Sequence, residues 1–324
     1  MRSVTFLLVA AACAAIVFAV MRWIGNGYVF FAGYVVLQYI VLATAWNILG
    51  GYCGYVNFGT AAFFALGAYT TIVLQKLAPI PLPLAMVVGG LVSGVLGLGM
   101  GYLTLRLRGA YFSIATLAMA VVAQTLMVNW SLVGGSAGTF IIRPARAPLL
   151  GIAYIQYLCL LMLVLSVLTL ALARTIERSR LGYGFAAIRD DELAAEASGV
   201  PTLRLKLLAT TLSGAVMGMA GAPLPFYVTY LDPASAFSLS YAVNTIAMPL
   251  IGGTASWPGP MIGAVLIATL QQVATVTISS AVNLLIVGVV LVGFVVAAPN
   301  GILGLLQAAH LGRGNRLRLS AVQR

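Results

Sequence analysis

The residues of this 324-residue chain that could do chemistry are few, and they are concentrated in one stretch. Five of the six acidic residues lie between residues 174 and 206, namely Glu177, Asp190, Asp191, Glu192 and Glu196. Basic residues bracket this stretch, and the sequence on either side is apolar enough to lie in a bilayer. We call residues 174–206 the acidic loop. We predict that it forms a short water-exposed helix between two membrane spans, where it could contact a soluble partner.

The parts needed for enzymatic chemistry are missing from the sequence. The single histidine, His310, lies beyond the last predicted span and has no partner nearby in sequence. Cys13, Cys53 and Cys159 lie in apolar stretches without short spacing, which is typical of buried, reduced thiols that act as small hydrophobic residues. Zinc sites and Ser-His-Asp hydrolysis therefore lack their residues. We expect no catalytic residue, no metal site and no cofactor.

The composition indicates an all-α, polytopic helical membrane protein. Hydrophobic residues make up 62% of the chain and charged residues only 7%, against about 25% charged residues in an ordinary globular domain. We predict about ten transmembrane helices, the first of them retained rather than cleaved as a signal peptide, and the eighth short enough to be a half-helix. The predicted spans are residues 4–20, 31–49, 61–74, 82–105, 111–130, 154–173, 205–228, 241–250, 261–277 and 282–297.

The distribution of basic residues predicts the orientation of these spans. If the acidic loop is cytoplasmic, 13 of the 17 lysines and arginines fall on the cytoplasmic side, as the positive-inside rule requires. Both termini are then cytoplasmic. The net charge of +11 reflects this bias, so we expect no nucleic-acid partner. We expect residues 1–308 to form a single transmembrane domain, with the acidic loop (174–206) within it, and residues 309–324 to form a basic cytoplasmic tail.

Two glycine-rich interruptions, residues 50–59 and 252–263, break the apolar pattern. We expect broken or short helices there, because non-helical backbone at membrane depth must be buried in protein or line a watery cavity. Paired interruptions in the two halves of a chain are typical of a substrate route. Small residues also permit tight helix packing, and the sequence leaves both interpretations open.

Polar side chains inside the predicted spans are mostly amides. An amide in hydrocarbon needs a partner, so each one either makes an interhelical hydrogen bond or lines a translocation path. No ionisable residue lies near the centre of a span, although proton-coupled and sodium-coupled carriers use such groups. The energy for any transport is therefore expected from outside the chain. The candidates for a translocation path are Gln38, Asn47, Asn57, Gln124, Asn244 and Gln271.

Within the acidic loop, residues 181–184 are predicted to form a turn and residues 191–198 a helix of about two turns. An aspartate suits the N-cap, and Gly199 with Pro201 ends the helix. Glu192 and Glu196 lie four residues apart and would repel each other by roughly 0.2–0.5 kcal/mol. Arg189 would share their face if the helix reached back that far. The segment is predicted either to dock into a groove with basic residues or to remain a solvated loop.

The acidic loop resembles a known family. Ala194 and Ala195, followed by Gly199, are similar to the E-A-A-x3-G cytoplasmic loop of ABC-importer permeases. Residues 187–200 resemble the branched-chain amino acid type, the LivM-like branch, as do residues 51–69, 107–118 and 251–264. Leu193 stands where the general motif has glutamate. This departure leaves open whether Glu192 or Glu196 contacts the ATPase.

The resemblance implies a permease subunit of an ABC importer in a bacterial inner (plasma) membrane, moving branched-chain or related amino acids. Its partners would be a second homologous permease, two ABC ATPase subunits, a periplasmic solute-binding protein and the lipid bilayer. The chain has no G-x-x-x-x-G-K-[ST] motif, so ATP hydrolysis would belong to the partners. A urea or short-amide permease, and a stand-alone secondary carrier or channel, remain alternatives. The residues expected to couple to the ATPase are Ile188, Arg189, Asp190, Asp191, Glu192, Ala194, Ala195, Glu196 and Gly199.

Overall fold

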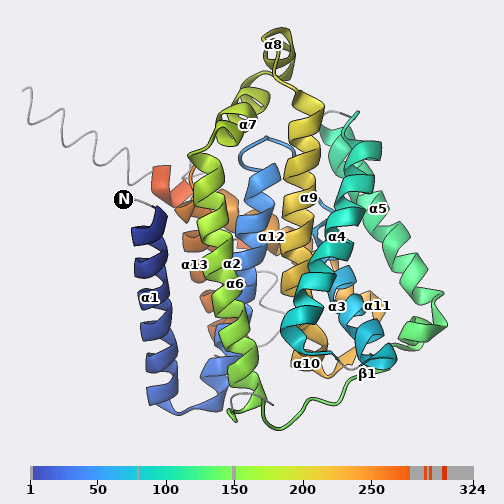
Figure 1. Ribbon diagram of the computed structural model, residues 1–324, viewed down its shortest axis with the longest axis vertical. Helices are drawn as coiled ribbons and strands as arrows, with labels where there is room; N and C mark the ends of the chain where they lie inside the picture. Colours follow the sequence, from blue (N-terminus) through green and yellow to red (C-terminus); the bar gives the residue numbers. More distant parts are fainter. Residues whose placement is uncertain are drawn as a thin grey trace, which may run out of the picture.

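The long helices of the chain run between two ends of the molecule in a computed structural model (Figure 1). The structure describes residues 3–78, 80–107, 109–147, 151–277, 288–289, 292–293 and 301–304. Within these residues, nine helices or broken helices are long and apolar enough to cross a membrane. The all-α, polytopic prediction is therefore confirmed. The tenth predicted span, residues 282–297, lies almost entirely outside the described residues, as does the predicted tail, residues 309–324.

The elements follow the predicted spans to within a few residues. Two short strands, β1 (Thr139–Phe140) and β2 (Tyr230–Leu231), pair antiparallel at the end opposite the acidic loop. Two 3-10 turns, η1 (Ser131–Val133) and η2 (Gly135–Ala137), precede β1. The helices are α1 (Ser3–Ile24), α2 (Gly27–Leu49), α3 (Thr60–Leu77), α4 (Leu82–Thr104), α5 (Ala110–Val128), α6 (Tyr154–Glu177), α7 (Arg180–Asp190), α8 (Glu192–Ala197), α9 (Thr202–Gly221), α10 (Leu224–Val228), α11 (Pro233–Ala236), α12 (Leu239–Gly252) and α13 (Pro258–Thr277).

The helix α12 is the short element that the sequence predicts. Its 14 residues extend about 21 Å at 1.5 Å per residue, which is less than the roughly 30 Å of a hydrocarbon core. The shorter helix α11 precedes it, and the two together form one candidate span, Pro233–Gly252. The half-helix interpretation of this region is therefore consistent with the structure.

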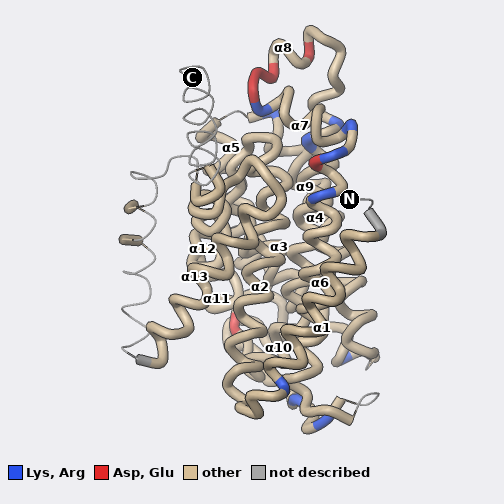
Figure 2. The backbone as a smooth tube through the Cα atoms, turned by 90° about the vertical axis from the view of Figure 1, so that its left-hand side faces the viewer, with Lys and Arg blue, Asp and Glu red and all other residues tan. Residues whose placement is uncertain are grey.

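Charged residues gather at the two ends of the molecule and leave an uncharged band between them (Figure 2). The acidic loop lies at one end, together with α7 and α8. Helices that face this band expose large apolar side chains, such as Leu91 and Val95 on α4 and Ile114 on α5. A bilayer core accepts such a surface and excludes exposed charge. The chain is therefore a multi-pass membrane protein.

Small residues hold the centre of the bundle together. Helix α9 packs against α3 and α4, and a methyl group added at Gly67 would lie only 1.9 Å from the backbone oxygen of Gly218. Ser93 donates a hydrogen bond to the backbone oxygen of Phe63 across the same contact, at 2.9 Å. In lipid there is no hydrophobic driving force between helices, so close backbone approach and interhelical hydrogen bonds stabilise the contact.

The two glycine-rich interruptions lie beside each other at the end that carries the acidic loop. A methyl group added at Gly51 would lie 2.9 Å from the Thr254 backbone oxygen, and the Asn47 side-chain nitrogen, on α2 just before the first interruption, donates to that same oxygen at 3.1 Å. In the second interruption, a methyl group at Gly259 would lie 1.7 Å from the backbone oxygen of Gly253. These glycines therefore serve close packing, which is one of the two interpretations open at the sequence level.

Candidate functional site

The acidic loop folds as two helices, α7 and α8, above the ends of the long helices (Figure 1). Ser179 caps α7, since its hydroxyl oxygen accepts a hydrogen bond from the Leu181 backbone nitrogen at 3.2 Å. The predicted turn at residues 181–184 is wrong, because these residues lie inside α7. Phe185 and Ile188 explain the difference, since they are buried in a hydrophobic cluster with Cys53 and give α7 an apolar face.

The second helix of the loop, α8, starts as the sequence predicts. The Asp191 carboxylate accepts hydrogen bonds from the backbone nitrogens of Leu193 at 2.9 Å and Ala194 at 3.1 Å. After α8 the chain turns at Gly199, whose φ of +84° lies in the left-handed region that glycine tolerates. Asp191 itself is extended, with φ −160° and ψ 109°. This break separates α7 from α8, so Arg189 does not lie on one continuous helix with Glu192.

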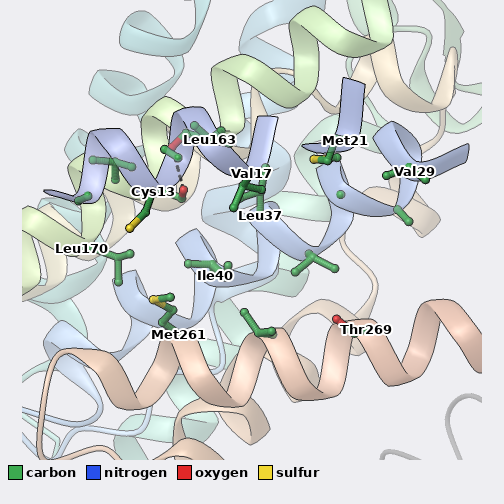
Figure 3. A pocket seen from close by; sticks show the side chains of 18 of the residues that line it. Cys13, Val17, Met21, Val29, Leu37, Ile40, Leu163, Leu170, Met261 and Thr269 are labelled. Atoms are coloured by element: carbon green, nitrogen blue, oxygen red, sulfur yellow. Dashed lines mark hydrogen bonds between the residues drawn. The ribbon is translucent and has the colours of Figure 1, made fainter. Parts of the chain in front are cut away.

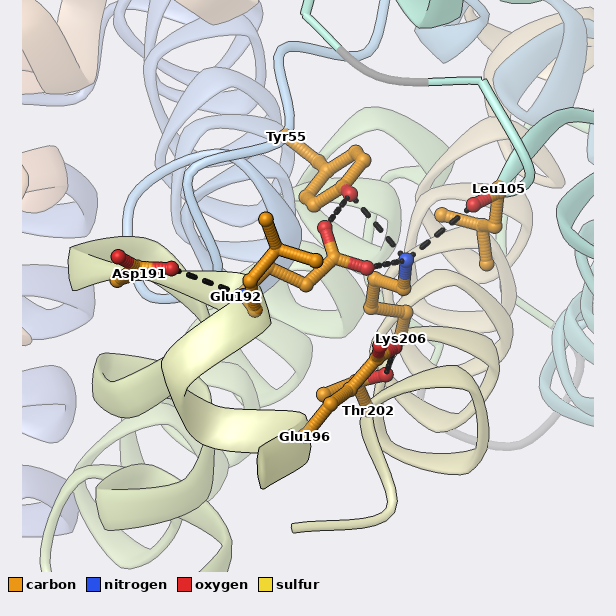
Figure 4. A network of polar contacts seen from close by, with 8 residues as sticks. Tyr55, Leu105, Asp191, Glu192, Glu196, Thr202 and Lys206 are labelled. Atoms are coloured by element: carbon orange, nitrogen blue, oxygen red, sulfur yellow. Dashed lines mark hydrogen bonds and ion pairs between the residues drawn. The ribbon is translucent and has the colours of Figure 1, made fainter. Parts of the chain in front are cut away.

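Glu192 points into the protein rather than into solvent (Figure 4). Its carboxylate accepts a hydrogen bond from the Lys206 ammonium at 2.6 Å and another from the Tyr55 hydroxyl. Lys206 also donates to the Leu105 backbone oxygen at 3.2 Å. The Glu192 side chain is 13% exposed and the Lys206 side chain 4%. Burial of an ion pair is tolerated when further hydrogen bonds satisfy its polar atoms. Lys206 also offsets the predicted repulsion between Glu192 and Glu196.

Three other predicted coupling residues face outward. Glu196 is exposed on α8 and accepts a hydrogen bond from the Thr202 hydroxyl at 2.6 Å. Arg189 forms an exposed ion pair with Asp190 at 3.4 Å. Such surface pairs contribute little to stability, about 0–1 kcal/mol. The loop thus has an outer, solvated face and an inner, tightly bonded one. Asp191, Ala194 and Gly199 also lie on the exposed side, whereas Ile188, Glu192 and Ala195 lie inside or partly inside.

A second carboxylate of the acidic loop, Glu177, also faces inward. It ends α6 and accepts a hydrogen bond from the Trp257 backbone nitrogen at 2.6 Å, and a longer one from the Tyr52 hydroxyl at 3.4 Å. Burial, followed by the nearby Glu177 carboxylate, raises the pKa of Tyr52, so its hydroxyl stays protonated and can donate. Next to it, the Arg174 guanidinium lies 4.0 Å from the centroid of the Phe6 ring, a cation–π contact.

Sequence reasoning missed the residues that meet these two carboxylates. Tyr52 and Tyr55 lie three residues apart in the first glycine-rich interruption, and Trp257 lies in the second. From the sequence, Lys206 indicates only the orientation of the chain, as one of the basic residues on the predicted cytoplasmic side. A tyrosine pair in a glycine-rich stretch, next to a membrane loop rich in acids, is the only signal in the sequence that could have indicated these contacts.

Two of the predicted path amides meet in the bundle. The Gln271 side-chain nitrogen on α13 donates to the Asn244 side-chain oxygen on α12 at 3.1 Å. The Asn244 nitrogen in turn donates to the Tyr39 hydroxyl on α2 at 3.2 Å. This row of hydrogen bonds ties three helices together. It is the interhelical arrangement that amides in hydrocarbon favour.

The other predicted path amides are dispersed. Asn47 bonds to Thr254, as described above, and the Asn57 side-chain oxygen accepts from the Gly59 backbone nitrogen at 2.7 Å. Gln38 is buried on α2 and Gln124 is half-buried on α5. The structure therefore brings Asn244 and Gln271 together, whereas Gln124 lies on a different helix, α5.

The described residues line two cavities of note. The larger, of about 860 Å³, lies among α1, α2, α6 and α13 (Figure 3), and its lining is almost wholly apolar. Cys13 lines it and is exposed, so the prediction that all three thiols are buried is wrong for this residue; Cys53 and Cys159 are buried. None of the predicted path amides lines this cavity. The smaller cavity, of about 430 Å³, lies beside Tyr55, Arg189 and Glu192.

Comparison with known proteins confirms the resemblance of the acidic loop. Residues 27–295 match the permease component of branched-chain amino acid transport systems. The high-affinity branched-chain amino acid transport system permease protein LivM of Salmonella typhimurium is 28% identical over 289 residues, covering 82% of this chain and 67% of that protein. The protein of the same name in Escherichia coli is 27% identical over the same length.

A more distant relative is the probable branched-chain amino acid transport permease protein LivH of Methanocaldococcus jannaschii. It is 25% identical over 265 residues, which cover 76% of this chain and 82% of that protein. No solved structure matches the chain significantly. The matched region includes α2 to α13 and the acidic loop between α6 and α9. The chain therefore belongs to the family of permease components of branched-chain amino acid transport systems.

Proposed function

We propose that this chain is a membrane-spanning subunit of an ABC importer that moves branched-chain or related amino acids across a bacterial inner membrane. The observation that carries the proposal is the family match, which runs through residues 27–295 and so includes the acidic loop. The names of the relatives from Salmonella typhimurium and Escherichia coli give branched-chain amino acids as their transported solutes. Permeases for urea or short amides are the alternative within this kind of transporter.

The acidic loop is the proposed docking site for the ATPase. In this proposal the loop lies on the cytoplasmic side of the membrane, as do both termini of the chain. The outer face of α8 suits this role, since Leu193 is 62% exposed whereas Ala195, on the inner side, is 5% exposed. A six-residue helix is too short to be stable alone in water. Its N-cap and the Glu192–Lys206 pair hold it in place, so a partner can push on it as a rigid unit.

In the proposed mechanism, ATP closes a pair of ATPase subunits that hold α8 of this chain and the matching loop of a second, homologous permease. The motion of α8 switches the two helix bundles between outward and inward access. A periplasmic solute-binding protein delivers the solute, so selectivity rests mainly with that protein. This chain supplies weak polar contacts along the path.

The proposed path runs along α2 and α12, past Asn244 and Gln271. Besides the amide row, the hydroxyls of Tyr34 and Thr44 on α2 and of Thr245 on α12 are buried and lack a hydrogen-bond partner among the described residues. A buried hydroxyl left in this state costs about 1–3 kcal/mol. Water or a passing solute with polar groups would satisfy these atoms, which supports a path at this interface.

Reconstitution in liposomes tests the proposal. The chain is purified alone and together with two ATPase subunits, a second permease and a solute-binding protein, and uptake of leucine is measured with and without ATP. We expect uptake only from the full assembly and only with ATP. Solute movement by the single chain without an ATPase would favour a secondary carrier or channel instead. Competition by urea or acetamide, but not by valine, would favour the amide alternative.

A further inference from the structure

Glu192 connects α8 to two other segments of the chain. It belongs to α8, but its carboxylate is shared between Lys206 on α9 and Tyr55 in the first glycine-rich interruption. Because charge-assisted hydrogen bonds between buried groups are strong and geometrically specific, α8 can shift only if Tyr55 moves with it or the hydrogen bond breaks. The Lys206 ammonium also donates to the Tyr55 hydroxyl oxygen at 3.2 Å, so each of the three side chains contacts the other two.

Glu177 makes a similar connection at the other end of the loop. It lies three residues before α7, and its carboxylate accepts from Tyr52 in the first interruption and from the Trp257 backbone in the second. The α7 helix packs on the same segment, since a methyl group added at Gly54 would lie 3.0 Å from the Arg189 side chain. Two acidic residues of the loop are thus bonded to the two glycine-rich interruptions.

The interruptions in turn bond to the transmembrane helices. The Trp46 ring nitrogen on α2 donates to the Asn57 backbone oxygen at 2.9 Å. The Phe58 backbone nitrogen donates to the Thr116 hydroxyl oxygen on α5 at 3.1 Å. With the contact between Asn47 and Thr254, these bonds form a contiguous network from α8 to α2, α5 and the segment between α12 and α13.

We propose that Glu192 and Glu177 are positioning residues that transmit movement of the acidic loop to the glycine-rich interruptions, through the hydroxyls of Tyr55 and Tyr52. The proposal rests on the proposed function, since it assumes that a partner moves the loop. It also addresses which of Glu192 and Glu196 contacts the ATPase, a question left open because Leu193 stands where the general motif has glutamate. Glu192 bonds within the chain, and the ATPase contacts the outer face of α8, which carries Leu193 and Glu196.

The test uses the full assembly in liposomes and measures solute molecules moved per ATP hydrolysed. The variants are Tyr55→Phe, Tyr52→Phe and Glu192→Gln, and the control is Tyr111→Phe, an exposed tyrosine at the start of α5. We expect all three variants to hydrolyse ATP within about twofold of the parent but to lower the transport ratio about fivefold or more, the lower end of coupling between sites. The control leaves the ratio unchanged.

A merely structural role would lower assembly, ATP hydrolysis and transport together and leave the ratio between them constant. A constant ratio in Tyr55→Phe and Glu192→Gln would therefore overturn the proposal. If Glu192→Gln fails to insert, Tyr55→Phe decides, since it removes a single oxygen atom. An unmodified assembly that shows no ATP-dependent uptake would instead refute the proposed function, which distinguishes the two failures.

Discussion

The buried ion pair between Glu192 and Lys206 allows a sharp stability prediction. Lys206→Met removes the ammonium but keeps an unbranched side chain of similar length. The Glu192 carboxylate then keeps the Tyr55 hydroxyl but loses its 2.6 Å contact with a cation. The matched control is Arg204→Met, which removes an exposed charge two residues earlier on the same helix.

The magnitude follows from the burial of the pair. Removal of one partner from a buried pair costs about 3–5 kcal/mol, and we expect the lower end because Glu192 is 13% exposed and water can reach it. The double variant Lys206→Met with Glu192→Gln removes both charges, and we expect it to lose about 1 kcal/mol or less, since neutral replacements of a buried pair are often tolerated. Arg204→Met should change stability by at most about 0.5 kcal/mol.

Thermal unfolding in lipid nanodiscs measures these differences. With a shift on the order of 2 °C per kcal/mol for a chain of this size, Lys206→Met should melt roughly 6 °C below the parent, and the double variant should recover most of that loss. The reasoning would be refuted if Lys206→Met melted no lower than Arg204→Met, or if the double variant melted lower than Lys206→Met.

Three further predictions concern other parts of the chain. Asp191→Ala should destabilise α8 by about 1 kcal/mol through loss of its N-cap, seen as faster hydrogen exchange in residues 192–197; unchanged exchange would contradict the cap. Gly259→Ala should cost about 1–3 kcal/mol because the added methyl group would meet backbone, whereas Gly99→Ala, with open space around it, should melt like the parent; equal melting of the two variants would contradict the packing. Hydrogen bonds from Ser235 lower the pKa of Asp232, so the carboxylate stabilises the fold above its unfolded pKa of about 3.9 and loses this effect as the pH falls through the lower folded value. Asp232→Ala should therefore melt below the parent at pH 7, with the gap narrowing as the pH falls below about 3.9; a gap that does not narrow as the pH falls would contradict this assignment.

The sequence was sufficient for the architecture because membrane spans follow from composition and length. A run such as residues 82–105 can only be a span in a chain with so little charge, and α4 occupies Leu82–Thr104. The N-cap at Asp191 was also predictable, because capping depends on residues that are neighbours in sequence. The resemblance carried by Ala194, Ala195 and Gly199 led to the family that the comparisons confirm.

The inner face of the acidic loop could not be predicted in the same way. Glu192 meets Tyr55, which is 137 residues away in sequence, and no local pattern records such a contact. The predicted turn at residues 181–184 failed because Gly182 suggests a turn in sequence, whereas a methyl group there would lie 2.5 Å from the Ile176 backbone oxygen. This glycine permits close packing of α7, which depends on tertiary structure.

The roles of Asn244 and Gln271 also depend on tertiary contacts that the sequence does not reveal. The sequence identified Asn244 and Gln271 as polar groups in spans but left open whether they bond to each other or line a path. The bond between them depends on the packing of α12 against α13 and on the Tyr39 hydroxyl of α2. Uptake by variants at these positions will show whether the row also contacts solute.

Photocrosslinking tests the central claim, that an ATPase docks on the outer face of α8 and drives this permease. A photoreactive amino acid replaces Leu193 on α8, or Ile142 after β1 at the opposite end, which is 91% exposed. In membranes that contain the full assembly, we predict a crosslink to the ATPase from position 193 and none from position 142. A crosslink to the ATPase from position 142, with none from position 193, would contradict both the docking site and the orientation of the chain.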